Sequence, residues 1–166
     1  MERLSVEERA YIRPSPASGT LGGVAEKTRE SMLVCEAEGY DIVIVETVGV
    51  GQREIDVSRL CDTTCFVAQP GSGDSIQFLK AGILEVPHVL VVNKEDMGMV
   101  ARRTLAELGT ALGRAHADGD WEVPVLSASA TAGTGIEALA DTLALHGRVV
   151  RDSKRLHERR QGYRAH

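Results

Sequence analysis

The chain has 166 residues, of which 43% are hydrophobic and 26% charged, so we expect a single core of ordinary domain size rather than a multidomain assembly. Its longest apolar runs fall far short of the roughly 20 residues that a membrane-spanning helix needs, and the first residues are charged rather than part of an apolar signal segment. Three cysteines are too few, and odd in number, for a disulfide framework. These features predict a cytoplasmic protein with no membrane partner.

The net charge of −5 hides a basic tail. Residues 148 to 166 contain seven Arg or Lys against two acidic residues. Such a tail is typical either of a nucleic-acid contact or of a helix that faces solvent or another subunit. The acidic remainder of the chain, and Tyr163 as the single ring available for stacking in the tail, favour the helix, so we expect no nucleic-acid partner.

Helical and strand patterns alternate along the chain. Short segments rich in Val and Ile, bounded by polar residues or glycine, predict buried strands, and longer amphipathic segments predict helices. In chain order these are a helix over Gly23–Glu38, a strand over Asp41–Glu46, a strand over Cys65–Gln69, a helix over Asp74–Glu85, a strand over His88–Asn93, a helix over Met99–Ala117, a strand over Val123–Ser127 and a helix from Thr134 into the tail. The alternation predicts an α/β fold with a doubly wound, mostly parallel sheet.

The residues Asn93 to Asp96 spell N-K-E-D directly after an apolar strand. Ligands of such sheets bind beyond the carboxyl ends of the strands, and N-K-x-D at this place is the motif with which GTPases recognise guanine. The Asp96 carboxylate can accept paired hydrogen bonds from the ring N–H and the exocyclic amine of guanine. Asn93 would tie neighbouring loops together, and the Lys94 stem would lie over the base. The alternative is a polar turn in which Asp96 only caps a helix.

A second loop, S-A-S-A-T-A-G, follows the last predicted strand. Proteins that recognise guanine in this way direct a backbone N–H at the base oxygen from a loop at this place. Ser129, Ala130 and Thr131 are the candidates, because small side chains let the backbone approach closely. Turns of this composition are common, so the segment indicates a guanine site only together with N-K-E-D.

The segment D-I-V-I-V-E-T-V-G-V-G-Q places Glu46 at the tip of the first predicted strand and Gly49 three residues later. A carboxylate there can hold Mg²⁺ through a bound water, and a glycine amide can meet a terminal phosphate without steric obstruction. Gln52 can orient a water molecule, and a surface role for it fits the sequence equally well. Glu46, Gly49 and Gln52 are therefore the predicted catalytic residues.

Four segments, in this order and spacing, resemble the MeaB/ArgK-type GTPases: Y-I-R-P-S-P-A-S-G-T-L-G-G from residue 11, the segment around Glu46, G-S-G-D-S-I-Q-F-L-K-A-G-I-L-E from residue 71, and N-K-E-D. The resemblance covers essentially the whole chain. It implies a P-loop GTPase-like fold, GTP or GDP and Mg²⁺ as ligands, and a metallochaperone that assists a cobalamin-dependent acyl-CoA mutase, methylmalonyl-CoA mutase.

The same resemblance assigns switch segments. Glu46–Gln52 would form the second switch, and Arg13 would lie near the first. Gln69–Lys80 would form a third switch that contacts the mutase, with Gln69, Asp74, Gln77 and Lys80 as its candidate residues. The alternative for two of them is that Asp74 only caps its helix and Lys80 is a solvated charge.

The family's phosphate-binding loop, G-x-x-x-x-G-K-[ST], has no counterpart here, because none of the four lysines follows a glycine. The amides and the lysine of that loop cradle the phosphates. The sequence therefore resembles the carboxyl-terminal portion of such a GTPase, as a misassigned start, a frameshift or a split gene would produce. On this basis residues 1–145 correspond to part of the GTPase domain and residues 146–166 to the start of a helical dimerisation arm, which implies a homodimer for the full-length form.

The leading hypothesis is thus a GTP-binding and GTP-hydrolysing metallochaperone. The missing phosphate loop favours one alternative, a non-catalytic interaction module that keeps the mutase-facing surface. A second alternative, an ATPase or kinase linked to basic amino-acid transport, conflicts with N-K-E-D, because that motif selects guanine.

Overall fold

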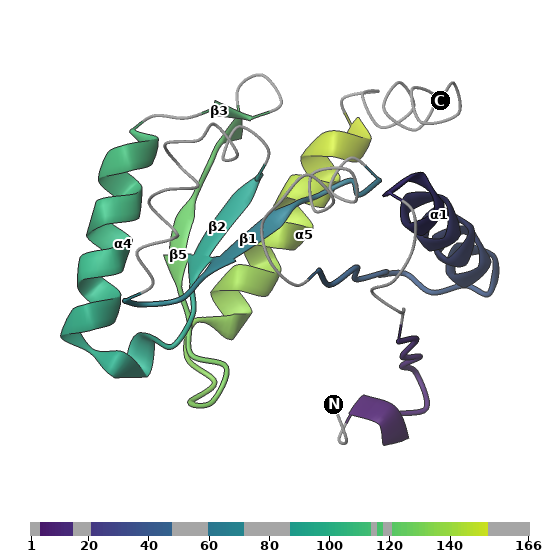
Figure 1. Ribbon diagram of the computed structural model, residues 1–166, viewed down its shortest axis with the longest axis horizontal. Coiled ribbons are helices and arrows are strands. Elements are labelled where there is room, and N and C mark those ends of the chain that lie inside the picture. Colours follow the sequence, from purple (N-terminus) through teal and green to yellow (C-terminus); the bar gives the residue numbers. More distant parts are fainter. Residues whose placement is uncertain are drawn as a thin grey trace. The chain divides into compact units, whose positions relative to one another are not determined.

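The computed structural model describes residues 4–14, 21–47, 60–71, 87–113, 116–117 and 121–152 (Figure 1). The chain forms two compact units, residues 1–43 and residues 44–166. The predicted helix over Asp74–Glu85 lies outside the described residues. Among the described residues, no helix has the length and apolar character needed to cross a membrane.

The first unit contains a short 3-10 helix, η1 (Leu4–Val6), and the α-helix α1 (Leu21–Ala37). The predicted helix over Gly23–Glu38 is confirmed, with its start two residues earlier. Helix α1 ends where Gly39 adopts a φ of +89°, and its last turn is closed by a bond of 3.1 Å from the Tyr40 N–H to the Cys35 carbonyl. A left-handed residue at this place is accessible to glycine at little cost.

The second unit is built on a parallel sheet in the order β1-β2-β5, formed by β1 (Cys65–Ala68), β2 (Val89–Val92) and β5 (Val125–Ser127). Cys65 pairs with Val89, and Leu90 pairs with Val125. These strands confirm three of the four predicted ones. Strand β5 begins two residues after the predicted start at Val123, because it follows Pro124, whose nitrogen cannot donate to a strand ladder.

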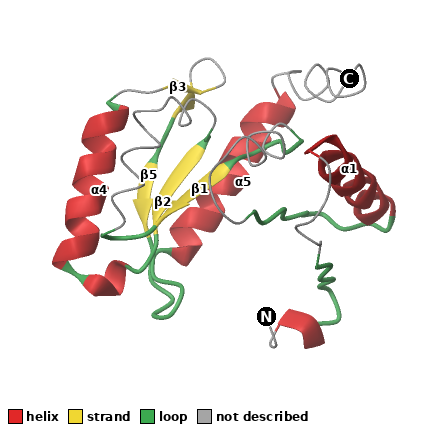
Figure 2. Cartoon of the chain, in the orientation of Figure 1, coloured by secondary structure: helices red, strands yellow, loops and turns green. Residues whose placement is uncertain are grey.

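Helices cover both faces of this sheet. Helix α4 (Met99–Leu112) and helix α5 (Ile136–Asp152) lie on opposite sides of the strands (Figures 1 and 2). All four residues of the central strand β2 are buried, which explains why its sequence is continuously apolar rather than alternating. The doubly wound α/β class predicted from the sequence is confirmed.

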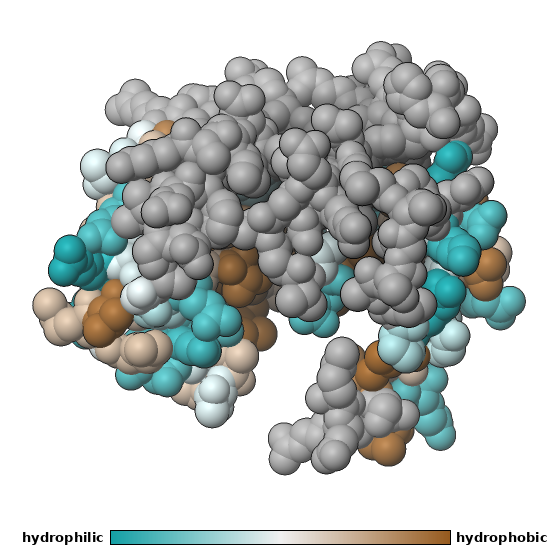
Figure 3. Space-filling model, viewed as in Figure 1, coloured by the Kyte–Doolittle hydropathy of each residue, from teal (hydrophilic) through white to brown (hydrophobic). Residues whose placement is uncertain are grey.

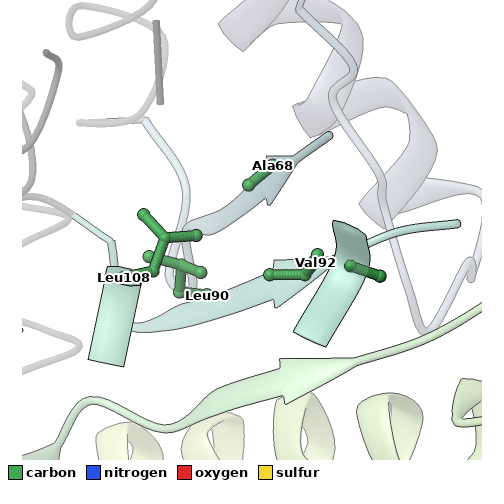
Figure 4. Packing of buried hydrophobic residues seen from close by; sticks show 5 residues of the cluster. Ala68, Leu90, Val92 and Leu108 are labelled. Atoms are coloured by element: carbon green, nitrogen blue, oxygen red, sulfur yellow. The ribbon is translucent and has the colours of Figure 1, made fainter. Parts of the chain in front are cut away.

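The core lies between the sheet and α4 (Figure 4). It contains Ala68 of β1, Leu90 and Val92 of β2, and Ala101 and Leu108 of α4. Figure 4 shows the side chains of Leu90 and Leu108 next to one another. The buried positions of α4 recur every three or four residues, as a helix with one face against a sheet requires.

Helix α4 is shorter than the predicted helix over Met99–Ala117. It ends at Leu112 because Gly113 adopts a φ of +56° and its N–H bonds to the Gly109 carbonyl at 3.1 Å. Beyond it, β3 (His116–Ala117) and β4 (Trp121–Glu122) form a two-stranded antiparallel sheet. Part of the predicted helix is therefore a strand, and the glycine that stops the helix is the reason.

The predicted strand over Asp41–Glu46 is wrong for this structure. Residues 42–47 belong to neither a helix nor a sheet, and Ile42 and Ile44 are 77% and 85% exposed. A strand exists only when a neighbour shares its backbone hydrogen bonds. Within the described part of the chain this segment has no such neighbour, so its strong β propensity is not expressed.

Helix α5 confirms the helix predicted from Thr134 onward, with its first residue at Ile136. It passes through position 146 without a break, so the expected boundary between residues 145 and 146 falls inside a helix. His146 is fully buried under the amino ends of the strands, where its ring lies 4.3 Å from that of His88 and 4.8 Å from that of Trp121. This contact anchors α5 to the sheet.

Candidate functional site

The carboxyl ends of the three parallel strands bring three loops together. Gln69 follows β1, Asn93 follows β2, and Ala128 follows β5. Backbone hydrogen bonds continue beyond the strands: the Asn93 N–H donates to the Ala68 carbonyl at 3.0 Å, and the Ala128 N–H donates to the Val92 carbonyl at 2.9 Å. This edge of the sheet is where open α/β sheets bind ligands.

Side chains of N-K-E-D bond directly to the S-A-S-A-T-A-G loop. The Asn93 side-chain oxygen accepts a bond of 3.2 Å from the Ala130 N–H. The Ser129 hydroxyl donates to Oδ1 of Asp96 at 2.5 Å, and the Glu95 N–H donates to the Ala128 carbonyl at 3.0 Å. The two loops therefore form one hydrogen-bonded unit.

Asp96 and Ser129 differ sharply in burial. Ser129 is fully buried, whereas Asp96 is exposed. A carboxylate offers about four acceptor positions on its two oxygens, so the bond from Ser129 leaves Asp96 able to accept the two donors of a planar base. The buried hydroxyl fixes the direction of an exposed carboxylate, as a preorganised binding group requires.

The S-A-S-A-T-A-G loop closes on itself. The Ser129 N–H donates to the Thr134 carbonyl at 2.9 Å, the Gly133 N–H donates to the Ser129 carbonyl at 2.8 Å, and the Ala132 N–H donates to the Ser129 hydroxyl at 3.1 Å. Of the three predicted donors, the Ser129 and Ala130 N–H groups thus have partners within the protein. The Thr131 N–H makes no hydrogen bond within the described residues.

Glycine at position 135 allows this closure. Gly135 has a φ of +71°, and a Cβ there would lie 2.2 Å from the Ser127 carbonyl oxygen. That distance is impossible for a real contact, so any other residue would push the loop away from the end of β5. The loop and the first turn of α5 can approach the strand only because position 135 has no side chain.

Lys94 has the single positive φ among the described non-glycine residues, with φ 60° and ψ 43°. This left-handed conformation costs a non-glycine residue on the order of 1 kcal/mol. Its ammonium group donates a bond of 2.9 Å to Oε1 of Gln69. The strained backbone and the long side chain together link the end of β2 to the end of β1.

The surface around α4 that faces the viewer in Figure 3 mixes hydrophilic and hydrophobic residues. Lys94, Glu95 and Asp96, which precede α4 in the chain, are all exposed. Their charges therefore meet solvent directly, and a ligand can reach them without any rearrangement of the core. The arrangement suits recognition of a polar planar group by hydrogen bonds at a sheet edge.

The described residues do not assemble every predicted site residue. The guanine candidates Asn93, Lys94, Asp96, Ser129, Ala130 and Thr131 lie together in the two bonded loops. Glu46 is exposed in the segment 42–47, and Arg13 donates to the Ser31 hydroxyl in the first unit. Gly49, Gln52, Asp74, Gln77 and Lys80 lie outside the described residues.

Among those residues the structure describes, no three His, Cys, Asp or Glu side chains gather closely enough to hold a metal ion. Glu46 was the single residue predicted to approach Mg²⁺, through a bound water. Such a role needs partners from the ligand itself, as Mg²⁺ in nucleotide sites is commonly held by one or two carboxylates and by phosphates. The role of Glu46 therefore stays a prediction.

The sequence does not predict one contact and one residue of the site. Gln69, predicted as part of a partner-contacting switch, bonds to Lys94 through its side chain, and its role in the switch stays a prediction. Gly135 carried no prediction although it sets how closely the loop approaches β5. A G-T-G sequence just before a helix was a usable signal for Gly135, because glycine is enriched where the backbone must come close. Nothing in the sequence signals the pairing of Gln69 with Lys94.

A parallel α/β sheet with two bonded polar loops at its carboxyl edge defines a protein of the nucleotide-binding α/β class. The family described as "Methylmalonyl Co-A mutase-associated GTPase MeaB" matches residues 1–166. The chain belongs to this family of GTPases, as its resemblance to the MeaB/ArgK type implied. Family members bind guanine nucleotides, so the family agrees with the N-K-E-D motif.

Several relatives are similar over most of this chain. The protein named GTPase ArgK from Escherichia coli K12 is 40% identical over 97% of the chain. The mouse protein named methylmalonic aciduria type A homolog, mitochondrial, is 42% identical over 86% of it, and a relative from Caulobacter vibrioides is 46% identical over 90%.

The matched regions make up 50%, 35% and 47% of those relatives respectively. The chain thus spans about half, or less, of the length of the curated relatives it matches. The activities and partners of the whole relatives are therefore only proposed for this chain, in the next subsection.

Proposed function

We propose that this chain supplies the guanine-recognition half of a GTP-binding, GTP-hydrolysing metallochaperone. The observation that carries the proposal is the bond from the buried Ser129 hydroxyl to the exposed Asp96 carboxylate. A carboxylate held in one direction can accept from the ring N–H and the amine of guanine, whereas adenine offers no such pair of donors. The Thr131 N–H, and the Ala130 N–H if Asn93 releases it, are the donors for the base oxygen.

Guanine recognition is tested by calorimetric titration of the chain with GDP, GTP and ADP. The proposal predicts that GDP binds at least tenfold more tightly than ADP, a difference of about 1.4 kcal/mol. Glu137→Gln changes an exposed residue in the first turn of α5 and serves as a matched control that keeps the preference. Equal affinities for GDP and ADP would exclude the guanine site.

Hydrolysis is the second part of the proposal, with Glu46, Gly49 and Gln52 as the catalytic residues. Mg²⁺, when bound, would neutralise phosphate charge as the terminal phosphoryl group is transferred. Glu46 would orient a water ligand of the ion, and Gln52 would orient the attacking water. Because the sequence contains no phosphate-binding loop, we expect little turnover by this chain alone. Phosphate release from GTP, measured for Glu46→Ala and its parent in a full-length background that carries the phosphate-binding loop, tests this role. Identical rates for both would remove Glu46 from the mechanism.

The interaction-module alternative rests on the sequence, which contains no G-x-x-x-x-G-K-[ST]. Each preorganised donor to the reacting group in an enzyme is worth roughly 10²- to 10³-fold in rate, and that motif supplies several. The alternative predicts binding of the partner without turnover of GTP by this chain. The GTPase family speaks against the third possibility, an ATPase or kinase linked to amino-acid transport.

The proposed partner is a cobalamin-dependent acyl-CoA mutase, which the family description and the name of the mouse relative support. Asp74, Gln77 and Lys80, outside the described residues, would contact it. Pull-down of methylmalonyl-CoA mutase by the chain should weaken with Asp74→Ala and Lys80→Ala. It should persist with Glu107→Ala, which removes an exposed ion pair on α4. Equal capture by all variants would show that this segment is not the contact.

We also propose that residues 146–166 begin a helical dimerisation arm. The support is α5, which continues past position 146 to Asp152 and exposes Arg148, Val149 and Arg151. Sedimentation of the chain with and without Val149→Asp tests the arm.

A cytoplasmic location, expected from the sequence, also stays a proposal, since the name of the mouse relative assigns that protein to mitochondria. Cell fractionation distinguishes the two compartments.

A further inference from the structure

Two bonds join the end of β1 to the N-K-E-D loop. The Asn93 N–H donates to the Ala68 carbonyl at 3.0 Å, and the Lys94 ammonium donates to Oε1 of Gln69 at 2.9 Å. The first bond fixes the backbone at Asn93, directly before Lys94, and the second holds the ammonium end of the Lys94 side chain. The Lys94 side chain is therefore attached to the end of β1 at its tip and lies next to a fixed backbone at its base.

The direction of Lys94 is set by its unusual backbone. Its φ of 60° is flanked by the Asn93 bond to Ala68 and by the Glu95 N–H bond to the Ala128 carbonyl at 3.0 Å. A strained residue persists only where its surroundings over-determine it. The conformation aims the side chain along the sheet edge toward β1, beside the residues proposed to bind guanine.

Gln69 also begins a segment that is attached to α4. Two residues later, the Gly71 N–H faces the Thr104 hydroxyl at 3.5 Å, and a Cβ added at Gly71 would lie 3.7 Å from Cγ1 of Val100 on α4. Thr104 is buried, and its hydroxyl donates to the Val100 carbonyl at 3.1 Å. Residues 69–71 therefore run from the tip of Lys94 to the surface of α4.

We propose that Gln69 is a positioning residue for guanine recognition: through its bond to the Lys94 ammonium, it couples the position of residues 69–71 to the affinity for the base. This inference rests on the proposed guanine site and deepens it. The base would lie against the methylene groups of Lys94, whose ammonium end is held by Gln69. A movement of residues 69–71 would break that bond, free the Lys94 side chain and lower the affinity for guanine. By linkage, a bound base also favours the segment in its present position.

The experiment is calorimetric titration of guanosine and of GDP into the chain and into Gln69→Ala, Gln69→Glu, Lys94→Met and the double variant Gln69→Ala/Lys94→Met. Gln69→Ala should weaken both ligands by the same factor, about three- to tenfold, because the effect acts on the base rather than on phosphate. Gln69→Glu keeps an acceptor for the ammonium and should retain the parent affinity.

The double variant isolates the coupling. In the Lys94→Met background, Gln69→Ala should cause no further loss, as expected when one residue acts through the other. Glu107→Ala, which also deletes one exposed hydrogen bond, made at 2.8 Å to Arg103 on α4, is the matched control and should bind both ligands like the parent. Thermal midpoints of Gln69→Ala and Glu107→Ala should agree within the scatter of replicates.

Two outcomes would overturn the inference. One is an unchanged guanosine affinity in Gln69→Ala, and the other is equal losses from Gln69→Ala with and without Lys94. Both presuppose that the parent chain binds guanosine or GDP. If the parent binds neither ligand, the proposed guanine site itself fails, and that result is distinct from failure of the coupling alone.

Discussion

The Ser129 hydroxyl donates to the Asp96 carboxylate at 2.5 Å, although 33 residues separate the two in the chain. Ser129 is fully buried, and its oxygen also accepts a bond of 3.1 Å from the Ala132 N–H. One hydroxyl therefore holds the fold of its own loop and the direction of the carboxylate. The site is built before any ligand arrives.

Ser129→Ala should weaken GDP binding by roughly tenfold, because a hydrogen bond to a charged group is worth about 1.5–3 kcal/mol and part of that orients Asp96. The measurement is the dissociation constant for GDP by calorimetry. Thr142→Ala, which removes an exposed hydroxyl bond of 2.7 Å on α5, is the control and should bind like the parent. Equal affinities for Ser129→Ala and the control would show that the bond does not orient Asp96.

Gly135→Ala should destabilise the second unit more than Gly133→Ala. Both glycines have positive φ values, of 71° and 75°, so both substitutions carry a similar backbone cost of about 1 kcal/mol. Only at position 135 would the added Cβ meet a backbone atom, the Ser127 oxygen at 2.2 Å; at position 133 nothing lies within 4 Å. Urea unfolding followed by circular dichroism measures the difference, and equal midpoints would contradict it.

Trp121→Phe should lower the free energy of unfolding by about 1 kcal/mol, the typical value of one buried hydrogen bond. The indole N–H of Trp121 donates to the His88 carbonyl at 2.8 Å, while its ring packs against His146. Phenylalanine keeps a ring and loses the donor, whereas Trp121→Ala loses both and should cost more. If Phe and Ala destabilise the protein equally in urea titrations, the ring contact contributes nothing.

The free energy of unfolding should fall between about pH 9 and pH 11. Burial raises the pKa of the Cys65 thiol from 9.0 to about 11, and burial, then the charge of Asp62, raises the pKa of Cys61. In this window the unfolded chain releases thiol protons that the folded chain retains, so rising pH favours unfolding. At about 1.4 kcal/mol per pKa unit, the Cys65 contribution is on the order of 2 kcal/mol.

Thermal unfolding recorded from pH 8 to pH 11 measures this fall. Cys65→Ala should make the decline shallower, and Thr110→Ala, which removes an exposed hydroxyl from α4, serves as the control. A Cys65→Ala profile as steep as that of the parent would show that the buried thiol is not the cause.

The sheet could be predicted because its strands carry their own signal. The segment Val89–Val92 is short, apolar and buried along its whole length, and such a run has few alternatives. The segment from Asp41 to Glu46 carries the same signal and is not a strand, because pairing depends on a neighbour that local sequence cannot supply. The end of α4 was misjudged for a different reason, since Gly113 stops it where the apolar periodicity alone would continue.

The guanine loops were found from the sequence because N-K-E-D and S-A-S-A-T-A-G each follow a strand. Their mutual bonds, Ser129 to Asp96 and Ala130 to Asn93, join residues that are far apart in the chain. The two motifs identify all four of these residues from the sequence, but not which of them bond to one another. The bond from Lys94 to Gln69 could not be predicted, because it depends on which strands are neighbours and on a left-handed backbone that lysine rarely adopts.

Asp96→Asn tests the central claim, guanine recognition by a carboxylate at the end of β2, most directly. Asparagine replaces one acceptor oxygen by a donor, so the variant should lose affinity for GDP and gain affinity for XDP, whose exocyclic oxygen needs a donor. Calorimetric titration of both nucleotides into parent and variant measures the exchange. We predict that the ratio of GDP to XDP affinity falls by at least tenfold in the variant; an unchanged ratio would contradict the account.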